Sequence, residues 1–196
     1  MIVLDPLLIV LGIIGLIVVV GIIISIVIFN SLVTTLKQVE NAWAQIDVQL
    51  KRRADLIPNL VETVKGYAKF EKSVLTNVTN ARTAIMSSKS PKESAKANNM
   101  LSGALKSIFA VAEAYPTLQA SENFKALQEE LSSTENKVAF ARQFYNDMVM
   151  KWNTMIAVFP NSIFANTFNM NTPKEFFEVS EGEKKNVKVD FSDLGK

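Results

Sequence analysis

The feature that most constrains this chain is an uncharged apolar stretch of 23 residues near its N-terminus, from Leu7 to Phe29. Its only polar member is Ser25. As an α-helix this stretch would be about 34 Å long, slightly more than the ~30 Å hydrocarbon core of a bilayer. A buried core helix is the alternative, but a globular domain seldom needs a helix that is apolar on all sides. We therefore predict a transmembrane helix over residues 7–29, after a short flank over residues 1–6.

A cleaved signal peptide would also be apolar, but it has a basic first region and an apolar stretch of only about 7–15 residues. This chain has no Lys or Arg before Lys37. We therefore expect an uncleaved anchor that crosses the cell membrane once. Because Lys37, and later Lys51, Arg52 and Arg53, follow the stretch, the positive-inside rule favours an N-terminus outside and a soluble domain in the cytoplasm.

Small residues interrupt the apolar stretch at Gly12, Gly15, Gly21 and Ser25. Gly21 and Ser25 have the spacing of four that lets two membrane helices approach closely. These four residues are a candidate face for helix packing within the membrane, and they predict a homo-oligomer.

Beyond residue 30, apolar residues recur at alternating spacings of three and four, which is typical of helices packed side by side. The first stripe comprises Leu32, Leu36, Val39, Trp43, Ile46 and Leu50. Three more stripes follow, and no sustained alternation favours strands. We predict an all-α fold in which the membrane helix continues into an antiparallel four-helix bundle over residues 30–160.

Proline and capping residues set the predicted helix ends. The four helices are expected over about residues 30–56, 58–88, 91–115 and 121–159. Pro58 either kinks one long helix or starts a second one. Ser90, Pro91 and Glu93 have the spacing of a capping box at a helix start. A similar pattern, Ser132 to Glu135, would divide the fourth helix, but its uninterrupted apolar phase favours one helix.

The chain changes character after Pro160. The predicted aromatic-rich segment over residues 161–179 either docks on the bundle, which is the commoner outcome, or stays exposed for a partner or lipid. Its candidate docking face is Phe164, Phe168, Phe176 and Phe177. Residues 180–196 are charged and contain glycine, and they are expected to form a flexible tail.

Composition argues against catalysis. The chain has no cysteine and no histidine, so thiolate chemistry, imidazole bases and the Glu-x-x-His motif of di-iron bundles are excluded. No nucleophile elbow or phosphate-binding loop occurs. The net charge of +2 gives no reason to expect nucleic acid as a partner. We predict no enzyme activity, no metal site and no cofactor.

A polar run over residues 45–55 is the one unusual feature of the bundle. Continuing the first stripe beyond Leu50 reaches Arg53, which would then point partly inward and need a carboxylate partner. The candidate polar network is Asp47, Arg53, Glu62, Glu135 and Asp147. It either sets the register of the helices or forms a binding site.

Several runs of this sequence resemble the LemA family closely. They are Trp43–Ala68 (WAQIDVQLKRRADLIPNLVETVKGYA), Asn123–Leu131 (NFKALQEEL), Thr134–Asn136, Ala141–Asp147, Asn153–Thr154 and Phe159–Pro160. The resemblance implies a bacterial single-pass membrane protein with a four-helix bundle and no established enzymatic activity or cofactor. It also implies an accessory role near membrane proteases, by association only.

Two functions fit these expectations. The first is a membrane-anchored scaffold or adaptor that self-associates or docks other membrane proteins, with the lipid bilayer as its first partner. The alternative is an accessory protein that senses a ligand or stress and acts with a membrane protease.

Overall fold

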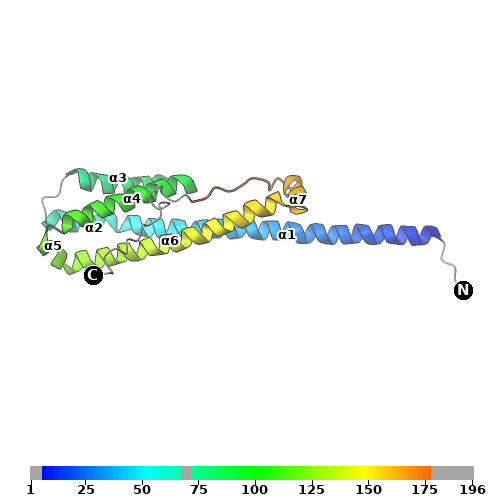
Figure 1. Ribbon diagram of the computed structural model, residues 1–196, viewed down its shortest axis with the longest axis horizontal. Helices are drawn as coiled ribbons and strands as arrows, with labels where there is room; N and C mark the ends of the chain where they lie inside the picture. The colour runs from blue at the N-terminus through cyan, green and yellow to red at the C-terminus, as the bar shows by residue number, and fades with distance from the viewer. Residues whose placement is uncertain (1–5, 68–71, 178–196) are drawn as a thin grey trace, which may run out of the picture. The chain divides into compact units, whose positions relative to one another are not determined.

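The computed structural model describes residues 6–67 and 72–177, and within these ranges every regular element is a helix. The helices are α1 (Pro6–Asp55), α2 (Ile57–Tyr67), α3 (Lys72–Ser87), α4 (Pro91–Ala112), α5 (Pro116–Ala120), α6 (Glu122–Ala157) and α7 (Asn161–Thr167) (Figure 1). The fold is all-α, as the apolar periodicity predicts. The tail predicted over residues 180–196 lies outside the described residues.

The apolar stretch and the first bundle helix are one continuous helix. In α1 the side chains from Leu7 to Val27 are exposed, except for the half-buried Ser25. From Ile28 onward one face is buried, at Ile28, Leu32, Thr35, Val39, Ala42, Ile46, Leu50 and Arg53. Within the described residues, α1 is the helix long and apolar enough to cross a membrane.

The chain divides into two compact units. The first contains the residues up to Ala42 together with Asn146–Lys174, and so holds the N-terminal part of α1, the end of α6 and α7. The second contains Trp43–Tyr145 and, at the end of the described residues, 175–177.

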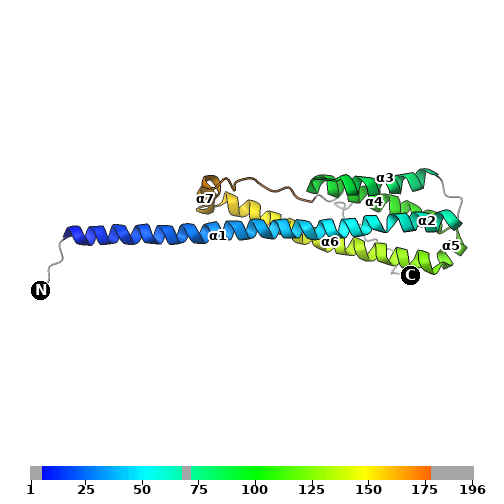
Figure 2. The ribbon, with the colours of Figure 1, turned by 180° about the vertical axis from the view of Figure 1, so that it is seen from behind.

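The second unit is an antiparallel bundle of four helical arms. The end of α1 with α2 forms one arm, and α3, α4 and α6 form the others, each running opposite to the one before it in the chain (Figures 1 and 2). Its core is apolar and includes Ile46, Leu50, Leu60, Val78, Leu101, Ile108, Phe124 and Leu131, each at most 3% exposed.

The prediction of one helix over residues 58–88 differs from the structure. Only one residue, Leu56, separates α1 from α2, and α2 continues in the same direction as α1 (Figure 2). Pro58 therefore interrupts the first arm without reversing it. Because proline has no N–H, it leaves the carbonyl of Ala54 without its helical donor, and Nε of Arg82 on α3 donates to that oxygen at 3.1 Å.

The predicted start of α4 has a clear side-chain cause. Oγ of Ser90 accepts a hydrogen bond from the backbone N–H of Glu93 at 3.2 Å, and Pro91 is the first residue of α4. The Glu93 carboxylate accepts from the N–H of Lys89, one residue earlier than a standard capping box would place it. In α6 the Ser132–Glu135 pattern causes no break: α6 is continuous there, and Oγ1 of Thr134 donates to the carbonyl of Leu131 within the helix at 2.9 Å.

Candidate functional site

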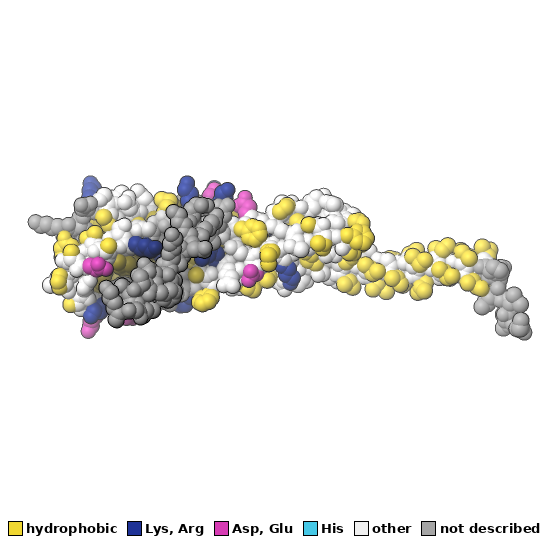
Figure 3. Space-filling model, viewed as in Figure 1, with side chains coloured by type: hydrophobic (Ala, Val, Ile, Leu, Met, Phe, Trp, Pro, Cys, Tyr) yellow, Lys and Arg dark blue, Asp and Glu magenta, His cyan; other side chains and the backbone are white. Residues whose placement is uncertain are grey.

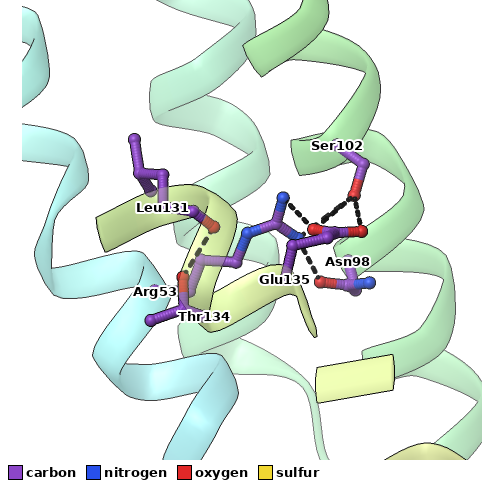
Figure 4. Close-up of polar contacts among 6 residues, drawn as sticks. All are labelled: Arg53, Asn98, Ser102, Leu131, Thr134 and Glu135. Carbon is purple, nitrogen blue, oxygen red and sulfur yellow. Dashed lines mark hydrogen bonds and ion pairs between the residues drawn. The ribbon is translucent and has the colours of Figure 1, made fainter. Parts of the chain in front are cut away.

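The most unusual side chain of the bundle is Arg53, near the end of α1, which is only 3% exposed. Its guanidinium forms an ion pair with Glu135 of α6. Nη1 donates to Oδ1 of Asn98 at 2.7 Å and to Oγ of Ser102 at 3.1 Å, both on α4 (Figure 4). The Ser102 hydroxyl in turn bonds the two carboxylate oxygens of Glu135 at 3.2 and 3.3 Å. One cation therefore ties three helices together.

Burial lowers the pKa of Arg53 from its ordinary value, and the charge of Glu135 and its hydrogen bond act in the opposite direction. A guanidinium has so high an intrinsic pKa that it stays protonated, so it cannot serve as a general base. The side chain of Glu135 is 40% exposed, so the carboxylate lies at the edge of the network and the cation at its centre. The arrangement suits a structural contact better than a reactive one.

Of the predicted polar network, the structure brings Arg53 and Glu135 together. Asp47 instead accepts from Lys51 at 2.6 Å, one turn away on the same helix, and Glu62 pairs with Lys65 at 2.9 Å. The side chain of Asp147 is exposed.

Sequence reasoning missed Asn98 and Ser102. Ser94, Asn98 and Ser102 are spaced by four, so they line one face of α4, and the first two are each 3% exposed. These polar residues recur at helical spacing beside the apolar stripe of Leu101 and Leu105, and this pattern could have predicted a polar contact next to the core.

A second set of polar contacts fixes the segment that follows α7. Within the first unit, Nε1 of Trp152 donates to the carbonyl of Thr172 at 3.1 Å. The side-chain amide of Asn153 accepts from the N–H of Lys174 at 2.8 Å and donates to its carbonyl at 3.0 Å. Because both backbone groups of Lys174 are bonded, this part of the chain has a defined place along α6.

The chain then continues into the second unit. There the hydroxyl of Tyr145 donates to the carbonyl of Glu175 at 2.8 Å. Phe177 is 1% exposed, and its ring lies 6.4 Å from that of Trp43, centroid to centroid. Burial, and secondarily the charge of Glu175, raises the pKa of Tyr145 to about 12.

The predicted aromatic docking face is thus divided between two environments. Phe177 is buried in the second unit, whereas Phe168 and Phe176 are 46% and 45% exposed. Phe164 is half-buried. Phe168 also packs its edge on Phe29 of α1, with ring centroids 4.8 Å apart.

The predicted membrane-packing face is open. A Cβ atom added at Gly12, Gly15 or Gly21 would meet nothing within 4 Å. Oγ of Ser25 donates to the carbonyl of Gly21 at 2.7 Å, so its hydroxyl is satisfied within the helix. The three glycines therefore have open space beside them in the described part of the chain, whereas Ser25 is half-buried.

Acidic side chains do not converge on a metal site in the described residues, where no group of three or more potential ligands is found. A surface hollow of about 420 Å³ lies between the first arm and α6. It is lined by Leu56, Asn59, Thr63, Asn123, Ala126, Leu127 and Glu130.

Comparison with known proteins gives a consistent result. The family model described as LemA family matches residues 42–191. Protein LemA of Metamycoplasma hominis is 27% identical over 169 residues, covering 84% of this chain and 74% of the relative. Magnetosome protein MamQ 2 of Paramagnetospirillum magneticum is 24% identical over 181 residues, covering 79% of this chain. The match spans 66% of that relative, slightly less than two thirds of its length. Magnetosome protein MamQ of Magnetospirillum gryphiswaldense is 23% identical with the same coverage.

Proposed function

We propose that this chain, which belongs to the LemA family, is a membrane-anchored helical scaffold or adaptor without catalytic activity that self-associates or docks other membrane proteins. The observation that carries the proposal is the change in α1 at Ile28. From Leu7 to Val27 the side chains are apolar and exposed apart from the half-buried Ser25, and from Ile28 onward one face is buried. Such a helix would anchor in lipid with its first part and contribute to a folded bundle with its second.

The proposal that the protein has no catalytic activity is supported by the contacts of the buried Arg53 guanidinium. The two Nη groups of Arg53 are bonded to Asn98, Ser102 and Glu135, whereas its Nε is buried without a hydrogen-bond partner among the described residues. The chain also has no histidine or cysteine.

Self-association is supported by the open face at Gly21 and Ser25. A Cβ added at Gly21 would have no atom within 4 Å, so the described part of the chain does not require a glycine at this position. A second copy of the helix could approach closely there.

The proposal is tested by crosslinking the full-length protein in intact membranes and then sizing it in mild detergent. We expect assemblies larger than one chain, or a bound membrane protein. Gly21→Ile should weaken self-association without disturbing the fold, whereas Val20→Ile, at the preceding position of the same helix, is the matched control. A strictly single-chain species without any co-purifying partner would contradict the scaffold.

We further propose that the bundle lies in the cytoplasm. The support is the position of Lys37, and of the basic run from Lys51 to Arg53, on the C-terminal side of the apolar stretch. Protease added to spheroplasts should then leave the bundle intact and degrade it only after lysis. Degradation before lysis would place the bundle outside.

The sensing alternative, with a membrane protease as partner, draws its support from the hollow between the first arm and α6. Small-molecule screening by thermal shift on the full-length protein separates the two functions. A ligand that raises the unfolding temperature, and whose effect is lost in Asn59→Leu, would favour sensing over scaffolding.

A further inference from the structure

Charged residues are missing from two long runs of this chain. The first is residues 6–36, which contain the apolar stretch of α1. The second is residues 152–173, which cover the end of α6, all of α7 and the segment after it. In a chain with 20% charged residues, a run of 22 without one is unusual. The second run is not apolar throughout, since it contains several asparagines and threonines.

The two uncharged runs belong to the same compact unit, and the end of the first lies at the level where the second begins. At one point Phe29 meets Phe168, with ring centroids 4.8 Å apart. At the other, Nζ of Lys151 donates to the side-chain oxygen of Gln38 at 3.2 Å. Lys151 is the charged residue directly before the second run, and Lys37, beside Gln38, is the first charge after the apolar stretch. The charged residues that border the two uncharged runs, Lys37 on α1 and Lys151 on α6, therefore lie at the same height along the two helices.

Large apolar side chains around α7 are exposed. The exposed fractions are 45% for Val158, 79% for Phe159, 55% for Ile163 and 46% for Phe168. The space-filling view shows hydrophobic side chains gathered over this end of α6 and α7 and along the N-terminal part of α1 (Figure 3). Soluble surfaces seldom group such residues, and a group of this kind marks a contact with another apolar surface.

We propose that α7 and its flanking residues, Val158–Phe168, lie in the headgroup region of the bilayer that α1 crosses, as a second, interfacial anchor. This inference rests on the proposed membrane span. If the hydrocarbon core ends near Phe29, Lys37 lies about 12 Å beyond it along the helix. The packing of Phe168 on Phe29 places α7 at the start of this interval.

The chemistry of the segment fits that depth. Interfacial helices bury their apolar face about 5–10 Å into the boundary between headgroups and acyl chains. Phe159 and Ile163 would supply that face, on which large apolar residues such as phenylalanine are typical of interfacial helices. Lys37 and Lys151 would lie where their amines meet lipid phosphates. The continuity with the membrane-spanning part of α1 identifies lipid, rather than a second protein, as the occupant.

The absence of cysteine makes a direct test possible, because one introduced cysteine gives one labelled site. The single variants Phe159→Cys and Ile163→Cys are made in the full-length protein, spin-labelled and reconstituted in phosphatidylcholine and phosphatidylglycerol vesicles. Phe140→Cys on α6 is the matched control, since Phe140 is 75% exposed. Val20→Cys reports the membrane span itself. Collisions of each label with oxygen, which concentrates in lipid, and with a water-soluble nickel complex are measured.

We expect the labels at 159 and 163 to gain oxygen collisions and lose nickel collisions relative to the label at 140. Labels at 159 and 163 that behave like the one at 140, while the label at 20 is in lipid, would overturn the interfacial anchor and leave the span intact. Shielding of 159 and 163 from both reagents would also overturn it, because a protein would then cover this face. A water-exposed label at 20 would instead refute the membrane span.

Discussion

Removing either member of the ion pair between Arg53 and Glu135 should destabilise the bundle by different amounts. Arg53 is 3% exposed and the side chain of Glu135 is 40% exposed. Glu135→Gln leaves a buried cation whose hydrogen-bond partners are all neutral. Arg53→Met leaves a carboxylate that water still reaches. We therefore expect Glu135→Gln to cost more stability than Arg53→Met.

The expected magnitudes follow from these exposures. A buried charge that loses its partner typically costs about 3–5 kcal/mol. We expect about 3 kcal/mol for Glu135→Gln, since glutamine can still accept a hydrogen bond from the guanidinium. In Arg53→Met, solvent screens the remaining carboxylate, and the main cost is the buried Asn98 oxygen left without its donor, about 1–2 kcal/mol. The double variant should cost little more than Arg53→Met alone, because neither charge then remains buried.

Urea unfolding of the full-length protein in non-ionic detergent, followed by far-ultraviolet circular dichroism, gives the free energies. The matched control is Arg52→Met, which removes the exposed pair of Arg52 with Glu130 and should change the free energy of unfolding by less than about 1 kcal/mol. The reasoning is refuted if Arg53→Met costs as much as Glu135→Gln, or if the two costs simply add in the double variant.

Three further predictions follow from single contacts. Tyr145→Phe should abolish a tyrosine ionisation near pH 12, measured by ultraviolet absorbance; because the folded pKa is raised from 10.0, the stabilisation by this hydroxyl is complete below about pH 10 and is lost as the pH rises through 12. An absorbance titration in which Tyr145→Phe removes no ionisation near pH 12 would contradict this. Asn153→Ala removes both bonds to Lys174 and should speed proteolytic cleavage around that residue; unchanged cleavage would mean that these bonds do not hold the segment. Arg82→Met removes the donor to the Ala54 carbonyl and should lower the free energy of unfolding in urea by about 1–2 kcal/mol, whereas an unchanged value would mean that water replaces the donor.

The buried face of α1 could be predicted in outline because its spacing reflects helix geometry. Leu32, Val39, Ile46 and Leu50 are at most 3% exposed, as the stripe requires. Two members of the predicted stripe, Leu36 and Trp43, are only half-buried, and the small residues Thr35 and Ala42 are buried beside them. Periodicity identifies a face of the helix, but the residues at its centre depend on how closely a neighbouring helix approaches.

Contacts between distant residues could not be predicted in the same way. The consequence of Pro58 depended on Arg82, which lies on another helix and supplies the hydrogen bond that proline cannot. Likewise, the charge of Arg53 required a carboxylate, but choosing Glu135 required knowing that α6 lies opposite. The fourth helix is expected to reach residue 159, but α6 ends at Ala157. Helical periodicity no longer applies beyond it, and Phe159 is 79% exposed.

The polar network also gives the bundle a property that its apolar stripes lack. Stripes that repeat every seven residues can pair again after sliding by one heptad, about 10 Å. Only one register places Arg53 against Asn98, Ser102 and Glu135 together. Any other register would bury the guanidinium without a carboxylate, at a cost of several kcal/mol. We infer that the network selects the register of α1, α4 and α6 more than it adds stability. The double variant should then keep its helicity while amide hydrogens of α4 exchange faster.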